Sequence, residues 1–326
     1  MDHNRHSQAT IESRTLRIAT TLLGLLLLAV VGFFGVYALA GSWYTPTPTP
    51  TQPAAVAEVP DPFASVSLIA KSAYVLDLTT GKVLYQQNAN AQLPLASLTK
   101  VALMLTVSQV LSPDTVITIP VHDTPDGTPV QIPAGSQWRV QDLMDVTLVE
   151  SSNEGAVLLA QAADPAVQAA YQSAPANDPT LWRMNALAGQ LGLTNTYFLN
   201  VSGLDLSTTQ SGAYGSAHDV AVLMSYAAST SLPIFSATTH TEVTRMTLEG
   251  KSITAINTDA ALDSIPGILM GKTGYTDLAG GNLAVVFDAG NGHPVVAVVL
   301  GSTEDGRFTD MKQLVPAAQT AVAEGQ

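Results

Sequence analysis

The 326-residue chain predicts an α/β (α+β) fold in which an antiparallel sheet is flanked by helices and a mostly helical lobe is inserted in the middle. Two observations lead to this prediction. Strand-like segments lie at both ends of the folded part, and apolar residues at helical spacing fill much of the stretch between them. The two ends of the domain must then complete the sheet together. Functional side chains from different parts of the chain can meet only between the sheet and the inserted lobe.

The first elements follow from local patterns. Residues 72–78 and 83–85 flank a Thr-Thr-Gly-Lys turn, which predicts a hairpin. A helix is expected to begin near Ser97. Apolar residues at helical spacing over 140–148 predict another helix, which ends just before Ser151.

The later elements follow in the same way. The middle of the chain is expected to be mostly helical to about residue 240. Apolar runs at 283–287 and 295–300 flank a loop rich in Gly, Asn and Asp, and they predict two buried strands joined as a hairpin. Apolar residues within 311–315 predict a closing helix.

The N-terminus predicts a membrane anchor. The segment 18–40 holds 23 uncharged, mostly apolar residues, enough for a helix that crosses a hydrocarbon layer of roughly 30 Å. Trp43 and Tyr44 follow it as an interfacial aromatic pair would. The alternative is a signal peptide cleaved after Ala38-Leu-Ala40. The apolar core is long for a signal peptide, which favours a retained single-pass anchor.

Charge predicts the orientation of this anchor. Basic residues precede it, and none follows until Lys71, so residues 1–17 are expected in the cytoplasm and the rest outside it. The basic residues in front are Arg5, Arg14 and Arg17.

A Thr/Pro-rich linker is expected over residues 41–62. It contains the run TPTPTPTQP, and such segments favour polyproline II, so the 18 residues 45–62 could extend over roughly 56 Å. A docking ligand of the Pro-x-x-Pro type is the alternative, but the expected position outside the cytoplasm favours a spacer. Residues 63–326 then form the folded domain.

Composition excludes several functions. The chain has no cysteine, which excludes disulfides and thiol chemistry. After residue 40 it carries 10 basic and 24 acidic residues, a net charge of −14, so nucleic acid is not an expected partner. No motif with metal-ligand spacing and no G-x-S-x-G is present, so neither a metal nor another cofactor is predicted. His218 beside Asp219 is interpreted as a helix-start pair.

Three short motifs point to chemistry. Ser97-Leu-Thr-Lys100, Ser151-Ser-Asn153 and Lys272-Thr-Gly274 each occur once, in this order. Any one of them alone would be a weak signal. The ordered set is specific, because together it supplies a nucleophile, a proton relay and a clamp for a carboxylate.

The first motif suits nucleophilic catalysis. Ser97 at a helix N-terminus faces the positive end of the helix dipole, which favours developing negative charge. Lys100 lies three residues later on the same helix face and can reach the hydroxyl. A lysine acts as a base only when neutral, and both burial and a second cation lower its pKa; Lys272 could be that cation.

The other two motifs suit proton transfer and substrate binding. Ser151 and Asn153 are two residues apart, so in an extended or loop segment both side chains point the same way. The hydroxyl can pass a proton to a leaving amine, and the amide can hold a peptide group. Lys272 and Thr273 are expected to lead a strand and to bind a terminal carboxylate.

With these motifs the chain from about residue 70 onward resembles the serine D-alanyl-D-alanine carboxypeptidases. These are the low-molecular-mass penicillin-binding proteins of the β-lactamase/transpeptidase-like superfamily. The likeness extends to further matching segments at 76–77, 80–85, 94–100, 184–185, 200–204 and 272–276.

The resemblance implies a role for each site residue. Ser97 would be the acylated nucleophile, Lys100 its base and Ser151 the proton shuttle. The backbone N–H groups of Ser97 and Tyr275 would form the oxyanion hole, where a single donor is typically worth about 10²–10³ in rate. The substrate would be held by Asn153, Lys272, Thr273, Gly274 and Tyr275, with Arg307 beside the clamp on its carboxylate.

The implied activity is removal of the terminal D-alanine from peptidoglycan stem peptides, through an acyl-enzyme, outside the bacterial cell membrane. β-Lactams would be covalent inhibitors. An endopeptidase or transpeptidase of the same fold is an alternative within enzymes. A non-hydrolytic penicillin or peptidoglycan sensor is the alternative from another class, and the intact motif set argues against it.

One difference from class A β-lactamases bears on the fate of bound penicillin. Those enzymes use a glutamate after the second motif to activate the deacylating water, yet no glutamate occurs between Glu154 and Glu242. The sequence therefore predicts a long-lived penicilloyl-enzyme.

Overall fold

The computed structural model describes residues 5–41, 60–128 and 130–325. These fall into two units, one within residues 1–59 and the other within 60–326, and each is described by itself. Residues 42–59 of the expected linker lie outside the described residues.

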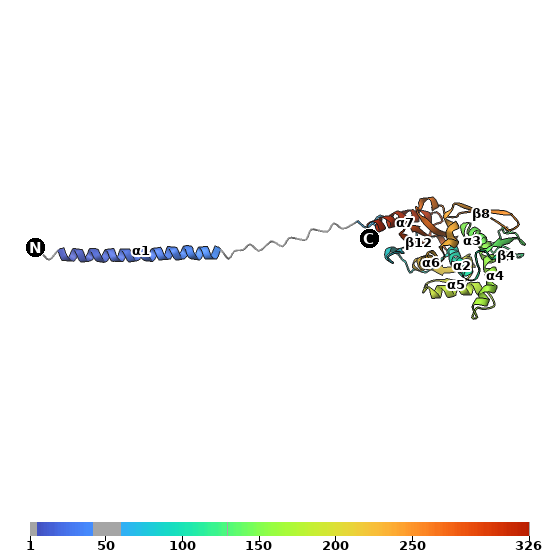
Figure 1. Ribbon diagram of the computed structural model, residues 1–326, viewed down its shortest axis with the longest axis horizontal. Helices are drawn as coiled ribbons and strands as arrows, with labels where there is room; N and C mark the ends of the chain where they lie inside the picture. Colours follow the sequence, from blue (N-terminus) through green and yellow to red (C-terminus); the bar gives the residue numbers. More distant parts are fainter. Residues whose placement is uncertain (1–4, 42–59, 129, 326) are drawn as a thin grey trace. The chain divides into compact units, whose positions relative to one another are not determined.

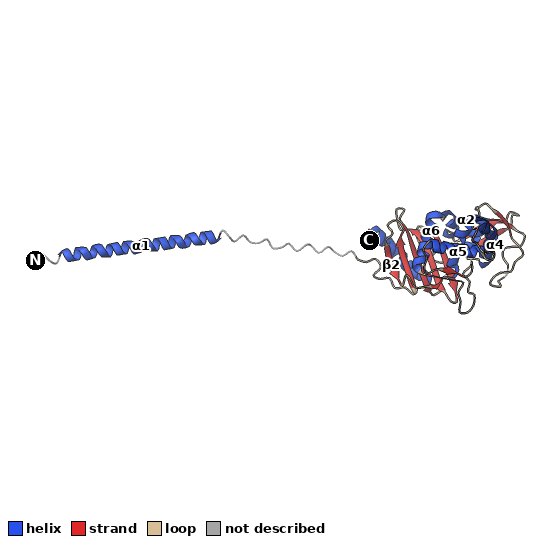
Figure 2. Cartoon of the chain, turned by 90° about the horizontal axis from the view of Figure 1, so that it is seen from below, coloured by secondary structure: helices blue, strands red, loops and turns tan. Residues whose placement is uncertain are grey.

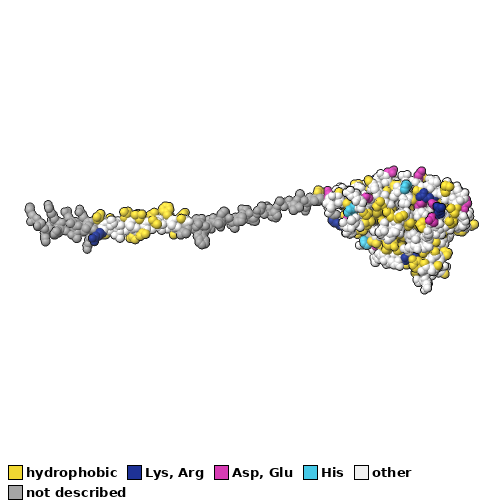
Figure 3. All heavy atoms as spheres, viewed as in Figure 1, with side chains coloured by type: hydrophobic (Ala, Val, Ile, Leu, Met, Phe, Trp, Pro, Cys, Tyr) yellow, Lys and Arg dark blue, Asp and Glu magenta, His cyan; other side chains and the backbone are white. Residues whose placement is uncertain are grey.

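The N-terminal unit contains one long helix, α1 (Arg5–Gly41). Within it, the 23 residues Leu16–Ala38 are long and apolar enough to cross a membrane, and none of that window is buried within the protein. Figure 3 shows hydrophobic side chains along the described part of this helix. The predicted anchor over 18–40 coincides closely with this apolar stretch.

The C-terminal unit is built around a five-stranded antiparallel sheet in the order β10-β11-β12-β1-β2. Figure 2 shows the strands of this unit in red, with helices packed beside them. The first strand of this unit, β1, pairs with its last strand, β12, in the interior of the sheet. This arrangement confirms the predicted fold, in which both ends of the domain complete the sheet. The strands are β1 (Ser72–Asp77), β2 (Val83–Gln87), β10 (Ile268–Thr276), β11 (Gly280–Asp288) and β12 (Pro294–Ser302).

Both faces of this sheet are covered, which explains why β11 and β12 are almost continuously apolar. Leu283 and Val285 share a core with Met311 and Leu314 of the closing helix α7 (Gly306–Ala323). The side chains that alternate with them, such as Val286, belong to a larger core shared with the helical lobe. A strand buried on both sides needs apolar residues at every position rather than at alternate ones.

The inserted lobe is mostly helical, as predicted (Figure 1). A short 3₁₀ turn, η1 (Ala96–Leu98), leads directly into its first helix. The helices are α2 (Thr99–Val110), α3 (Val140–Val149), α4 (Asn153–Ala170), α5 (Pro179–Gln190) and α6 (Ala217–Thr230), with 3₁₀ turns η2 (Leu232–Thr239) and η3 (Leu262–Ser264) after them.

Several small sheets were not predicted. They are formed by β3 (Leu93–Pro94), β7 (Ala213–Gly215) and β6 (Tyr197–Phe198), by β4 (Val116–Thr118) and β5 (Gln137–Arg139), and by the hairpin of β8 (Glu242–Met246) and β9 (Ser252–Ile256). Most of their strands have only two or three residues, too few for a periodic pattern, whereas β8 and β9 have five residues each.

Candidate active site

The predicted nucleophile Ser97 lies in η1, immediately before α2, so its expected position at a helix start is confirmed. Two glycines let other segments approach this turn closely. A Cβ at Gly203 would lie 1.9 Å from the carbonyl oxygen of Ala96, and one at Gly274 would lie 3.2 Å from the amide nitrogen of Ser97. Only glycine permits such contacts, and they bring strand β10 and the loop at 199–204 against the 3₁₀ turn that contains Ser97.

Lys100 is fully buried and its ammonium nitrogen is surrounded by acceptors. Its Nζ lies 2.7 Å from Ser97 Oγ, 2.8 Å from Asn153 Oδ1 and 3.0 Å from the carbonyl oxygen of Ser202. An amide oxygen and a backbone carbonyl can only accept hydrogen bonds, whereas a hydroxyl can also donate. A neutral Lys100 can therefore give its two protons to Asn153 and Ser202 and turn its lone pair toward the Ser97 hydroxyl.

The surroundings of Lys100 favour that neutral state. Burial lowers its pKa well below the ordinary lysine value, and the nearby charge of Lys272 lowers it further. Asp126 acts in the opposite direction, because its negative charge favours the ammonium form.

The second motif begins just after the end of α3, as expected, and of the two expected forms, extended or loop, the structure has a tight turn that leads into α4. Ser151 has a φ of 64°, in the left-handed region, and Asn153 is the first residue of α4. Ser152 caps this helix, since its Oγ accepts from the Gly155 amide at 3.0 Å. Both Ser151 and Asn153 still face the site, because a tight turn rather than an extended strand directs them there.

Ser151 contacts the third motif. Lys272 Nζ donates to Ser151 Oγ at 2.8 Å and to the carbonyl oxygen of Thr273 at 3.0 Å. Lys272 is only 3% exposed, and burial together with the charge of Arg307 lowers its pKa to about 7. The expectation that Lys272 leads a strand was wrong: it lies in the middle of β10, which begins at Ile268.

Arg307 supports the same strand from α7. It is 6% exposed, and its Nη1 donates to the carbonyl oxygen of Gly274 at 2.8 Å. Its guanidinium lies over the ring of Phe308, 4.6 Å from the centroid. The adjacent Tyr275 side chain is 45% exposed. Arg307 thus lies beside the Lys272 motif, and its contact with substrate stays a prediction.

Sequence reasoning missed two residues that touch the site. Ser202 supplies a carbonyl to Lys100, although the segment 200–204 had been noted only as a family likeness. Asn200 holds this loop, since its Oδ1 accepts from the amide of Gly203 at 2.7 Å. Asp126 accepts from Asn153 Nδ2 at 3.0 Å, and no motif in the sequence marks it.

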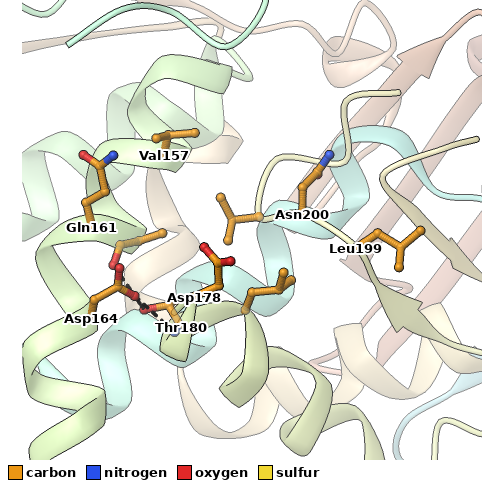
Figure 4. A pocket seen from close by; sticks show the side chains of 10 residues that line it. Val157, Gln161, Asp164, Asp178, Thr180, Leu199 and Asn200 are labelled. Carbon is orange, nitrogen blue, oxygen red and sulfur yellow. Dashed lines mark hydrogen bonds between the residues drawn. The ribbon is translucent and has the colours of Figure 1, made fainter. Parts of the chain in front are cut away.

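Two cavities of about 200 Å³ lie near these residues. One opens beside Ser151 and is lined by residues 150–154 together with Asp126, Thr128 and Gln131. The other, shown in Figure 4, lies between α4, the start of α5 and the segment 199–201. There Asp164 accepts from the amide and the hydroxyl of Thr180, which ties α5 to α4.

The described residues include no group of three or more His, Asp or Glu side chains that could hold a metal ion. His218 and Asp219 lie in the first turn of α6, with Nδ1 3.1 Å from Oδ1, as the helix-start interpretation expected.

Together the fold and the three converging motifs define a serine enzyme of the penicillin-binding, transpeptidase-like class. Residues 56–304 match the family model described as D-alanyl-D-alanine carboxypeptidase. The chain belongs to this family of serine peptidases, which confirms the resemblance drawn from the motifs.

Three similar proteins illustrate the relationship. The D-alanyl-D-alanine carboxypeptidase DacF of Bacillus subtilis is 29% identical over 256 residues, which cover 76% of this chain and 61% of the relative. A D-alanyl-D-alanine endopeptidase of Pseudomonas aeruginosa is 31% identical, covering 78% of this chain and 79% of the relative. The structure of penicillin-binding protein D2 from Listeria monocytogenes, in a cefotaxime-bound form, matches with a TM-score of 0.64 and 27% identity. The match covers 77% of this chain and 98% of that structure's chain. The chain thus spans about three-fifths of the Bacillus relative.

Proposed function

We propose that this protein is a membrane-anchored serine D-Ala-D-Ala carboxypeptidase that removes the terminal D-alanine from peptidoglycan stem peptides through an acyl-enzyme. The observation that carries the proposal is the set of contacts around Lys100. The oxygens of Asn153 and Ser202 can only accept, so they take the two protons of a neutral Lys100. The lone pair of Lys100 Nζ then faces Ser97 Oγ, 2.7 Å away. This is the geometry of a base poised to accept the proton of a nucleophilic hydroxyl.

In the acylation step, Ser97 Oγ attacks the carbonyl carbon of the peptide bond between the two D-alanines as its proton passes to Lys100. The oxyanion would lie between the N–H groups of Ser97 and Tyr275, which belong to neighbouring segments because Gly274 packs against the nucleophile's turn. The C–N bond then breaks. Because Lys272 donates to Ser151 Oγ, the Ser151 hydroxyl keeps its own proton available for the departing amine. The proton that Lys100 took from Ser97 would then pass to Ser151, which returns Lys100 to its neutral form.

Lys272 is proposed to hold the substrate's C-terminal carboxylate with Thr273 and Arg307. The strand β10 supports this role, since it is an edge strand of the sheet and an extended peptide can lie alongside it. The pKa of Lys272 is about 7, and a carboxylate that binds beside it would favour its charged form. Water then attacks the acyl-enzyme and releases the shortened peptide.

Covalent labelling tests the nucleophile. Fluorescent penicillin should modify Ser97, and peptide mass mapping should find the adduct there. Ser97→Ala should abolish the label. A label on another serine, or undiminished label in the variant, would contradict the assignment.

The same experiment tests the fate of the adduct. We expect the penicilloyl-enzyme to persist after excess drug is removed, because no glutamate occurs between Glu154 and Glu242, and the carboxylate of Glu154 already accepts hydrogen bonds from the amides of Gln131 and Ile132. Loss of the adduct within seconds would show that another group activates water.

An endopeptidase activity is the second candidate, favoured by the similarity to the Pseudomonas endopeptidase. The two reactions share the acyl-enzyme and differ in the amine that leaves. Mass spectrometry of the full chain incubated with a pentapeptide ending in D-Ala-D-Ala, or with a cross-linked dimer, separates them. Release of D-alanine supports the carboxypeptidase, and cleavage of the dimer alone supports the endopeptidase. Penicillin labelling without either product would indicate a sensor.

The proposal also assigns the remaining parts of the chain. Residues 1–17 would be cytoplasmic, 18–40 would anchor the chain in the bacterial cell membrane, and 41–62 would be a spacer to the catalytic domain of 63–326 outside it. The apolar, unburied helix over Leu16–Ala38 supports the anchor.

A further inference from the structure

A loop between β4 and β5, formed by residues 120–132, lies beside the second motif; position 129 is outside its described residues. Three contacts attach this loop to Glu154 in the first turn of α4. His122 Nε2 lies 2.7 Å from the Glu154 carboxylate, and the amides of Gln131 and Ile132 donate to it at 3.1 and 3.0 Å. The side chains of His122 and Glu154 are 8% and 5% exposed. Both arms of the loop are therefore fixed to the helix that begins with Asn153.

The middle of the loop presents Asp126 to the site. Its Oδ2 accepts from Asn153 Nδ2 at 3.0 Å, and its Oδ1 accepts from the amide and the hydroxyl of Thr128. Slight burial opposes ionisation, but these hydrogen bonds outweigh it and hold the pKa of Asp126 below its usual value. Asp126 is therefore an anion under ordinary conditions.

The contact fixes the orientation of the Asn153 amide. A carboxylate can only accept, so Asn153 must turn its NH₂ group toward Asp126. Its Oδ1 then faces the other way, where it accepts from Lys100 Nζ at 2.8 Å. Without Asp126, rotation of the amide by half a turn would place an NH₂ group against Lys100. A neutral lysine would then lose one of the two acceptors that direct its lone pair to Ser97.

We propose that Asp126 is a positioning residue for acylation, which orients the Asn153 amide and through it the base Lys100. The proposal rests on the proposed function, because it assigns Lys100 as the base of Ser97. Asp126 also acts through its charge. Of the charged groups that act on Lys100, Lys272 on β10 disfavours the ammonium form and Asp126 on the loop favours it.

The test is the rate of acylation by fluorescent penicillin, measured on the full chain as a function of pH. We expect Asp126→Ala to slow acylation by roughly 10-fold or more, because the hydrogen bond to a charged acceptor is lost. Asp126→Asn keeps one oxygen for Asn153 and should recover part of that rate. It also removes the negative charge, so Lys100 should lose its proton more readily and the acidic limb of the pH profile should move to lower pH.

Asp123→Asn is the matched control, since it removes an exposed carboxylate from the same loop. It should acylate like the unmodified protein. The proposal would be overturned if Asp126→Ala were acylated at the unmodified rate, or if Asp123→Asn were slowed as much as Asp126→Ala. It would also be overturned if Asp126→Asn and Asp126→Ala were equally slow and the pH profile were unchanged. Failure of the unmodified protein to be labelled at all would overturn the proposed function, and this proposal with it.

Discussion

At the scale of single residues, the two buried lysines differ in what surrounds them. Lys100 meets an amide oxygen, a backbone carbonyl and a hydroxyl, whereas Lys272 reaches Ser151 and the carbonyl of its own neighbour Thr273. Both have lowered pKa values because both are buried. Their partners therefore suggest different tasks for the same side chain: a base beside the nucleophile, and a cation beside the place where a carboxylate is expected.

Replacing each lysine separates these tasks. Lys100→Ala should slow acylation by roughly 10²–10⁴-fold with every substrate, the usual contribution of a general base. Lys272→Ala should slow acylation by peptides that end in a free carboxylate by roughly 10–100-fold, because a hydrogen bond to a charged group contributes about that much. Acylation by amidated peptides should slow less. Acylation rates on matched free and amidated peptides measure the difference. Equal losses in both variants on both peptides would refute the division of roles.

The pKa of Lys272 near 7 gives a prediction for pH. Below this value Lys272 is charged, and above it the free enzyme loses the cation that would bind a carboxylate. We therefore expect kcat/KM for free-carboxylate peptides to fall as pH rises above about 7, a fall that amidated peptides should not show. Parallel pH profiles for the two peptides would contradict a clamp role for Lys272.

At the scale of elements, the site depends on how closely β10 approaches the nucleophile's turn. A Cβ at Gly274 would lie 2.9 Å from the carbonyl oxygen of Leu95 and 3.2 Å from the amide nitrogen of Ser97. Backbone atoms on both sides cannot yield as a flexible side chain can. The glycine of the third motif therefore allows the strand to lie against the 3₁₀ turn.

Gly274→Ala should separate these two elements. We expect the domain to fold and acylation to fall by roughly 100-fold, because a displacement of about 1 Å at reacting groups can cost that much. Gly271→Ala in the same strand is the control. Its Cβ would lie 3.4 Å from the side chains of Ile268 and Val285 and 3.8 Å from the carbonyl oxygen of Ala284, which are tolerable distances, so this variant should remain active. Penicillin acylation and circular dichroism provide the measurements, and a fully active Gly274→Ala would show that the close approach is dispensable.

At the scale of the whole molecule, the chain combines an apolar helix with a separate globular unit. The window Leu16–Ala38 of this helix is long and apolar enough to cross a hydrocarbon layer. The globular unit buries both faces of its sheet and contains the three motifs. In the proposed arrangement, this helix would hold the catalytic domain near the membrane surface.

Retention of the helix can be tested directly. N-terminal sequencing of the protein recovered from membranes should begin at or near Met1. A mature protein that begins at Gly41 would show that the Ala38-Leu-Ala40 site is cleaved and that the anchor is lost.

The sequence by itself determined the residue types of the candidate site, their order along the chain and several of the elements around them, although not the positions of Lys272 and Asn153 within their elements. Apolar periodicity located α3 and the paired strands β11 and β12, and the motif order located Ser97, Lys100 and Lys272. These signals are local, because periodicity and turn chemistry depend on neighbours within a few positions. The two-residue strands and the left-handed turn at Ser151 carry no such signal.

Only the tertiary structure decided which groups surround the base. Lys100 meets Asn153, 53 positions away, and Ser202, 102 positions away. Asp126 reaches Asn153 from a loop that no motif marks. Such contacts arise when the lobe packs against the sheet, because burial brings distant segments together wherever their surfaces fit. The sequence therefore contains the side chains of the site in separate motifs, and packing determines how these side chains are oriented toward one another.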